Sequence, residues 1–111
     1  MIIAGNTMST KEEYGQIMRS ILNNKRECFV CRTPLNLHKH HIYEGARRSK
    51  SEQYGCWVYL CARHHNMSDE GVHFNRDLDL KIKRICQKAW QKHYNKTEDE
   101  FRAIFGRSYE N

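Results

Sequence analysis

Apolar residues recur at helical spacing in three separate stretches of the chain. Each stretch follows a good helix-capping residue, which is threonine in the first and third and asparagine in the second. Helices are therefore predicted over about residues 10–24, 76–94 and 97–106, with Gly106 ending the last one. The apolar positions expected to face the core are Tyr14, Ile17, Met18, Ile21 and Leu22 in the first helix, Leu78, Ile82, Ile85 and Ala89 in the second, and Phe101, Ile104 and Phe105 in the third.

Between the first two helices, the helical spacing gives way to short runs of strand-forming residues. Residues 28–42 predict a knuckle that leads into a strand, and the β-forming run 57–60 predicts a second strand. The polar and basic residues 43–55 between them predict a loop. A short helix is expected from Cys61, with an interruption at Gly71.

Length and composition narrow the class of protein. A chain of 111 residues has room for one domain, so we expect a single α+β domain over residues 1–111 with its core at about 28–75. Lysine and arginine number 19 against 13 aspartate and glutamate, and the net charge of +6 favours an anionic partner such as a nucleic acid. No run approaches the roughly 20 apolar residues of a membrane span. The start, residues 1–6, lacks the features of a signal peptide, so a cytoplasmic protein is expected.

The five cysteines and seven histidines are the candidate metal-binding and catalytic residues of this chain. A C-x-x-C motif places two thiolates on one turn, where both can reach a tetrahedral zinc ion, and a second pair of ligands follows at the same spacing. The predicted structural zinc ligands are Cys28, Cys31, Cys61 and His64. His65 and His73 remain alternatives to His64, and a redox role is disfavoured because no βαβ pattern surrounds the C-x-x-C. Cys56 and Cys86 are expected to be buried as small apolar side chains.

A second group of histidines lies at the expected end of the first strand and the start of the short helix. His40 and His41 end the strand and His65 opens the helix, so two strands and a helix are expected to bring them together. Hydrolysis of a phosphodiester needs a base that deprotonates water and a metal ion that stabilises charge at phosphorus and on the leaving oxygen. Imidazole suits both tasks, so these histidines predict a phosphodiester-cleaving site. His38 and His93 are assigned to the surface or the core.

The order C-x-x-C, H-H-I and L-C-x-x-H-H resembles the zinc-stabilised HNH, or ββα-metal, endonucleases. The resemblance is strongest to the phage and prophage branch that includes the RecA-dependent recombination-enhancement nucleases. It covers residues 28–75 well and residues 76–107 loosely. It implies cleavage of DNA, in recombination or DNA processing inside a bacterial host, with a RecA-like recombinase filament as a candidate partner. Little sequence specificity is expected, because no recognition helix or added specificity domain is evident in the sequence.

The resemblance also implies roles for single residues. The four predicted zinc ligands match the structural zinc positions of the family, and His41 matches the general base that activates water. His40 and His65 match ligands of the catalytic metal, for which Mg²⁺ or Mn²⁺ is expected, although Ni²⁺ or Zn²⁺ also suits imidazole ligands. His73 is a further candidate ligand from the helix side. This sequence has Cys56 where the family has the middle asparagine that braces the loop around the base.

Basic residues flank the predicted site on both sides along the chain. A group between the base and the second strand is expected to hold phosphates beside the cut, and a group on the long helix would extend that track. The predicted DNA contacts are Arg47, Arg48 and Lys50 in the first group, and Lys81, Arg84 and Lys88 in the second. The alternative function is a catalytically silent zinc module that binds DNA or a protein partner, which Cys56 at the asparagine position favours.

Overall fold

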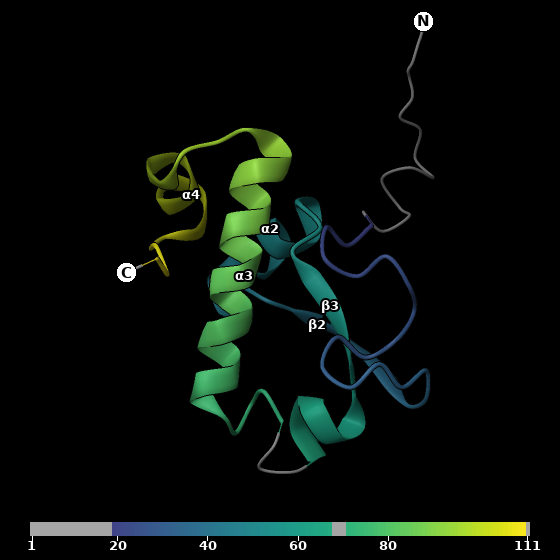
Figure 1. Ribbon diagram of the computed structural model, residues 1–111. Helices are drawn as coiled ribbons and strands as arrows, with labels where there is room; N and C mark the ends of the chain where they lie inside the picture. The colour runs from purple at the N-terminus through teal and green to yellow at the C-terminus, as the bar shows by residue number, and fades with distance from the viewer. Residues whose placement is uncertain (1–18, 68–70, 111) are drawn as a thin grey trace, which may run out of the picture.

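The computed structural model describes residues 19–67 and 71–110 (Figure 1). It contains a two-stranded antiparallel sheet and several helices, which confirms the predicted α+β class. Most of the helix predicted over 10–24 lies outside the described residues, and its described part, residues 19–24, is not helical. The elements in chain order are β2 (Leu37–His41), the 3₁₀ turn η1 (Gly45–Arg47), α2 (Arg48–Gln53), β3 (Trp57–Cys61), the π-helix η2 (Arg63–Met67), α3 (Arg76–Tyr94) and α4 (Glu98–Phe105).

The two strands are the scaffold on which the candidate site is built. They pair with His40 opposite Val58 and His41 opposite Trp57. Because successive side chains of a strand point to opposite faces, neighbouring His40 and His41 lie on different faces of the sheet. The core face carries His38, His40, Val58 and Leu60, and the outer face carries Leu37, Lys39, His41, Trp57, Tyr59 and Cys61.

The segment between the strands, predicted as a loop, contains a helix. Its buried Ser51 accepts a hydrogen bond from the amide of Tyr43 and donates one to the carbonyl of the same residue. This pair of hydrogen bonds holds α2 against the residue that follows β2 closely in the chain. The segment ends at Gly55, whose φ of +73° and close approach to the carbonyl of Arg19 leave no room for a Cβ atom.

The two C-terminal helices begin and end where the sequence predicts. Asn75 caps α3 by accepting a hydrogen bond from the amide of Leu78. Thr97 and Glu100 form the predicted capping box of α4, and Gly106 ends that helix with a φ of +92°. The local capping residues are therefore sufficient to define these boundaries.

The prediction of which α3 residues face the core is partly wrong. Ile82 is buried as predicted, but Ile85 is 38% exposed, and Cys86 and Trp90 are fully buried instead. The indole of Trp90 packs in an aromatic cluster with α4, and its ring centroid lies 5.4 Å from that of Phe101. This cluster turns the face of α3 that bears Trp90 toward the core.

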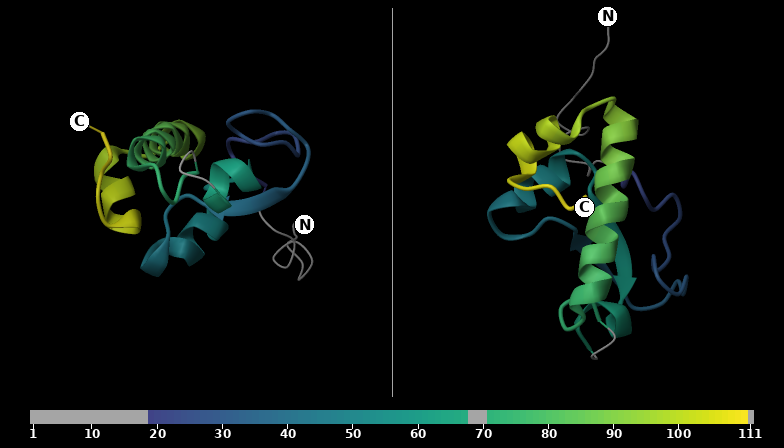
Figure 2. Two further views of the ribbon diagram at one scale, coloured as in Figure 1. Left: turned by 90° about the horizontal axis from the view of Figure 1, so that it is seen from below. Right: turned by 60° about the vertical axis from the view of Figure 1, so that its left-hand side comes forward.

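Helix α3 lies between α4 on one side and the sheet with residues 19–36 on the other (Figures 1 and 2). Its buried residues complete a core that includes Cys56 and Cys86, both fully buried as predicted. Among the described residues, no helix is long and apolar enough to cross a membrane.

Candidate metal centres

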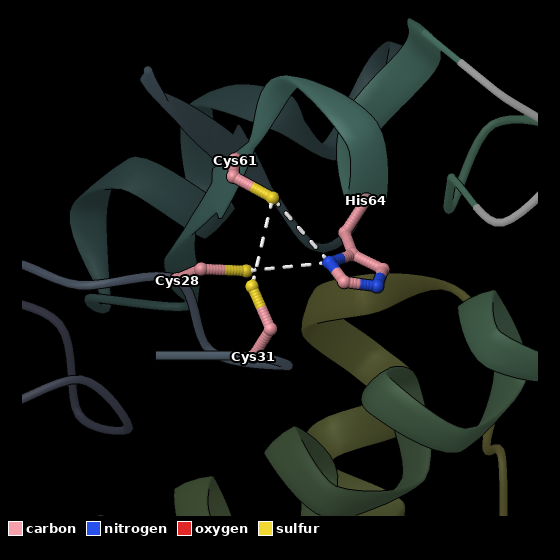
Figure 3. A group of neighbouring side chains, drawn as sticks. All are labelled: Cys28, Cys31, Cys61 and His64. Atoms are coloured by element: carbon pink, nitrogen blue, oxygen red, sulfur yellow. Dashed lines mark hydrogen bonds between the residues drawn. The ribbon is translucent and has the colours of Figure 1, made fainter. Parts of the chain in front are cut away.

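The four predicted zinc ligands converge at one point in the structure. Cys28 and Cys31 come from the knuckle before β2, Cys61 is the last residue of β3, and His64 lies in η2 (Figure 3). The Cys31 and Cys61 sulfurs are 3.8 Å apart. The Nδ1 atom of His64 lies 3.4 Å from the Cys61 sulfur and 3.8 Å from the Cys28 sulfur. A tetrahedral zinc ion with Zn–S bonds of about 2.3 Å and Zn–N bonds of about 2.0 Å separates its ligand atoms by about 3.5–3.8 Å. These three separations match a tetrahedral zinc site, and all four ligand atoms lie within 4.8 Å of one another, so the cluster could hold a zinc ion.

Backbone hydrogen bonds of the knuckle present its two sulfurs to the other ligands. The Cys28 amide donates to the carbonyl of Thr33, and the Arg32 amide donates to the carbonyl of Cys28, both at 2.8 Å. The Phe29 amide donates to the carbonyl of Tyr59 and so attaches the knuckle to β3. The C-x-x-C turn is therefore held beside the end of the strand that supplies the third sulfur.

The surroundings of the Cys28 thiol favour its ionised, thiolate form. Burial raises its pKa, but hydrogen bonds from backbone amides, those of Cys31, Cys61 and Val30, favour the negative charge more strongly. The net effect lowers the pKa of Cys28 from 9.0 to about 6. Since the thiolate is the form that binds metals, this environment favours a cation at the cluster.

A second cluster is formed by His40, His65 and His73, whose ligand atoms all lie within 4.8 Å of one another. The Nε2 atoms of His65 and His73 are 3.1 Å apart. His40 comes from β2 and is 3% exposed. Its buried Nε2 atom lies 3.5 Å from Oε2 of Glu44 but has no hydrogen-bond partner among the described residues. A buried nitrogen without a partner is costly, and a metal ion would satisfy it. The donor set therefore fits a divalent cation.

The backbone brings His73 back to His65 although eight residues separate them. The Val72 amide donates to the carbonyl of His64 at 2.8 Å, and the His73 amide donates to the carbonyl of His65 at 3.2 Å. A Cβ atom at Gly71 would lie 2.8 Å from the His65 carbonyl oxygen, so a glycine is needed for this close approach. The predicted interruption at Gly71 thus places the third histidine of the cluster.

Two members of the histidine cluster are held in the neutral form. Burial, followed by the charges of His65 and His73, lowers the pKa of His40 from 6.5 to about 3. Burial, followed by the charges of His73 and His38, lowers the pKa of His65 from 6.5 to about 4. Neutral imidazoles have the free lone pairs that metal binding requires.

Three further residues beside this cluster were not among the predicted site residues. The Nδ1 atom of His38, a residue assigned by default to the surface or the core, lies 2.9 Å from the Nδ1 atom of His65. Glu44 and Asp79 form a second potential metal-binding group with His40. The sequence could have identified His38, because it lies two residues before His40 and therefore on the same face of the strand. No feature of the sequence identifies Asp79.

His41 lies at the edge of this cluster and contacts α2. Its Nε2 atom is 2.7 Å from Oε1 of Glu52, and the Nε atom of Arg48 donates to its Nδ1 atom at 3.3 Å. A hollow of about 360 Å³ connects His41 with the cluster, and it is lined by Lys39, His40, His41, Glu44, Arg48, His65 and His73.

The expected convergence of His40, His41 and His65 is therefore only partly correct. The three rings that meet are those of His40, His65 and His73, with centroids 4.7–5.4 Å apart. His41 belongs to the opposite sheet face and shares the hollow without joining the ring cluster. The physical reason is the two-residue period of the strand, which separates adjacent side chains.

The predicted DNA contacts lie in three different places. Arg48 lines the hollow beside His41. Arg47 donates to the carbonyl of Ile104, and Lys50 donates to the side chain of Gln53. The predicted helical group, Lys81, Arg84 and Lys88, lines a separate hollow of about 390 Å³ together with Ile85 and Glu110.

Comparisons with known proteins identify no relative. No protein-family model, no curated protein and no solved structure matches the chain. The functional argument therefore depends on the chemistry and geometry of the residues of this chain.

Proposed function

We propose that this protein is a zinc-stabilised, metal-dependent endonuclease of the HNH type that hydrolyses phosphodiester bonds of DNA with little sequence specificity. The observation that supports this most directly is the hollow in which His40, His65 and His73 converge beside His41. It combines a site for a divalent cation with a separate imidazole that is available as a base. Such an enzyme would act on DNA in the cytoplasm of a bacterial host.

In this proposal the Cys₃His cluster has a structural role. A zinc ion on Cys28, Cys31, Cys61 and His64 would join the knuckle, the end of β3 and η2. Because His65 follows His64 directly, fixing the position of η2 also fixes His65. The structural site would thereby position the catalytic one.

The histidine cluster would hold Mg²⁺ or Mn²⁺, or a cation such as Ni²⁺ or Zn²⁺ that imidazole prefers. When bound, the cation supplies Lewis acidity, which stabilises negative charge on the phosphate and on the departing 3′ oxygen. His40, His65 and His73 would supply nitrogen ligands from three parts of the chain. The basic side chains of Arg48 and Lys39, which line the same hollow, would attract the phosphate.

The hydrogen bonds of His41 define which of its nitrogens can act as the base. A carboxylate can only accept hydrogen bonds and a guanidinium can only donate them. Nε2 of His41 therefore carries the proton toward Glu52, and the lone pair of Nδ1 accepts the hydrogen bond from Arg48. In the proposed reaction Nδ1 takes a proton from water, the water oxygen attacks phosphorus, and the bond to the 3′ oxygen breaks. A phosphate in the hollow would attract Arg48 and free Nδ1 for this step.

Plasmid nicking by the zinc-loaded protein tests the proposal. We expect nicking with at least one of Mg²⁺, Mn²⁺, Ni²⁺ and added Zn²⁺, none in EDTA, and none by His41→Ala, which should retain its structural zinc and its affinity for DNA. His93→Ala, which changes an exposed histidine on α3, is the matched control and should nick normally. If the His41→Ala protein nicks at the wild-type rate, the base assignment is wrong.

The second candidate function is a catalytically silent zinc module that binds DNA or a protein. It is favoured by Cys56, which replaces the bracing asparagine and is fully buried, so that it cannot reach the base. This function predicts DNA binding without nicking in every metal tested. A parallel reaction with a RecA-like filament separates it from a nuclease that requires such a partner, since only the latter would then cut.

A further inference from the structure

A basic cavity lies on the outer face of the sheet, and none of its lining residues is among the predicted DNA contacts. Its volume is about 430 Å³, and it lies between β2–β3 and the segment 19–26. Four of its lining residues are cationic and none is acidic. The cations are Arg19, Lys25, Arg26 and Lys39, and they surround Trp57 and Tyr59.

Hydrogen bonds to β3 hold the segment that supplies three of these cations. The Ile21 amide donates to the carbonyl of Gly55, and the side-chain oxygen of Asn23 accepts from the Tyr59 amide, both at 2.9 Å. The Ser20 hydroxyl donates to the carbonyl of Trp57. The segment therefore covers the free edge of β3, and its cationic side chains are presented from a fixed backbone.

The aromatic rings of the cavity orient two of the cations. Nζ of Lys39 lies 4.4 Å from the ring centroid of Trp57, and Cζ of Arg26 lies 5.3 Å from that of Tyr59. Such cation–π contacts reduce the freedom that a flexible side chain loses on binding. Trp57 is only 6% exposed, so the indole orients a cation and offers little surface on which a base could stack.

Three of the four cations are available to an external anion. Lys39 pairs with Glu52 at 2.7 Å. Arg19, Lys25 and Arg26 form no ion pair within the described part of the chain. A concave surface lined by cations concentrates positive electrostatic potential and attracts a polyanion.

The basic cavity borders the histidine hollow. Lys39 lines both. His41, the candidate base, lies on the same outer face and is paired with Trp57 in the register of the sheet. A polymer with evenly spaced anionic groups that has one group at His41 would therefore place the next groups over Lys39 and in the cavity.

We propose that the basic cavity binds phosphates of the DNA strand that is cut, on one side of the phosphate that is cleaved. This inference rests on the proposed nuclease function and assigns the flanking phosphates to Arg19, Lys25 and Arg26. The α3 hollow with Lys81, Arg84 and Lys88 shares no lining residue with the histidine hollow and contains Glu110. It therefore lacks both the shared border and the uniform charge of the basic cavity.

The test compares two triple variants that remove the same charge. Arg19→Ala/Lys25→Ala/Arg26→Ala changes the cavity, and the control Lys92→Ala/Lys96→Ala/Arg107→Ala changes exposed cations that are not among the predicted DNA contacts. DNA affinity is measured by fluorescence anisotropy of a labelled oligonucleotide over a series of salt concentrations, with zinc-loaded protein and no other divalent metal. We expect the cavity variant to lose about tenfold or more in affinity, and its salt slope to fall by about 2–3, since each phosphate contact contributes about 0.7–0.9. The control variant should stay within about twofold of the wild type, because it removes charge outside both the cavity and the predicted DNA contacts.

Several results would overturn the inference. They are equal losses in both triple variants, no loss in the cavity variant, or no DNA binding by the wild type at low salt. Displacement of DNA by polyglutamate at equal charge concentration would also overturn it, because the site would then recognise acidic peptides. Equal zinc content and equal thermal unfolding of both variants exclude a folding defect.

The same measurements separate this inference from the proposed nuclease. Affinity that depends on the cavity, without nicking in any metal, would leave the phosphate site standing and reject the nuclease. Nicking together with wild-type affinity of the cavity variant would leave the nuclease standing and reject the phosphate site.

Discussion

The Nε2 atom of His41 lies 2.7 Å from Oε1 of Glu52, a carboxylate supplied by α2. The same oxygen lies 2.7 Å from Nζ of Lys39, and hydrogen bonds from Lys39 and His41 lower the pKa of Glu52 despite its partial burial. Glu52 is thus an ionised acceptor that holds the His41 ring in one orientation.

Replacing Glu52 should therefore impair nicking through the orientation of His41. We expect Glu52→Ala to lower kcat about tenfold or more with little change in KM, and Glu52→Gln, which keeps an acceptor oxygen, to be less severe. The ¹⁵N chemical shifts of His41 should show the Nε2–H tautomer in the wild type and a mixture in Glu52→Ala. Asp77→Asn, which removes an exposed carboxylate on α3, is the control. An unchanged tautomer in Glu52→Ala would contradict the positioning role.

Loss of the Cys₃His cluster should prevent folding. Structural zinc sites contribute apparent binding free energies of about 10–16 kcal/mol, as much as the whole stability of a typical domain. We expect one tightly held zinc per chain by elemental analysis, and an unfolded protein after Cys61→Ser or prolonged chelation. Cys56→Ala removes a buried cysteine outside the cluster and should retain its zinc. A folded Cys61→Ser protein with a full complement of zinc would show that the cluster is not the zinc site.

His73 should be needed for the second, weaker metal site. Removing one of three imidazole ligands is expected to lower the affinity for Ni²⁺ or Mn²⁺ about tenfold or more. Isothermal titration of the zinc-loaded protein measures this for His73→Ala, with the exposed His93→Ala as its matched control. Equal affinities in the two variants would leave the histidine cluster without a role in metal binding.

The stability of the protein should fall as the pH falls from about 6.5 toward 4. His40 and His65 have folded-state pKa values of about 3 and about 4 against 6.5, so in this range the unfolded chain binds more protons than the folded one. Each such proton contributes a slope of about 1.4 kcal/mol per pH unit. Urea midpoints between pH 7.5 and 5, with zinc content checked at each pH, measure the effect. His65→Asn should show a smaller slope, and a wild-type midpoint independent of pH would contradict the prediction.

Features that depend on residues close together in the chain were accessible from the sequence. The caps at Asn75 and Thr97 define helix starts through hydrogen bonds to amides three residues away, and both helices occur where they were predicted. The C-x-x-C and C-x-x-H spacings likewise predicted four ligands that the structure brings together. Local spacing is informative in these cases because the chain geometry over three residues varies little.

Features that depend on contacts between distant segments became visible in the fold alone. The return of the backbone at Gly71 brings His73 to His65. Glu52 lies in a segment whose polar composition predicted a loop but which contains a helix, and hydrogen bonds of the buried Ser51 join that helix to Tyr43. The partners in each case are eight or more residues apart, and their approach depends on packing energies summed over many weak contacts, which no short motif records.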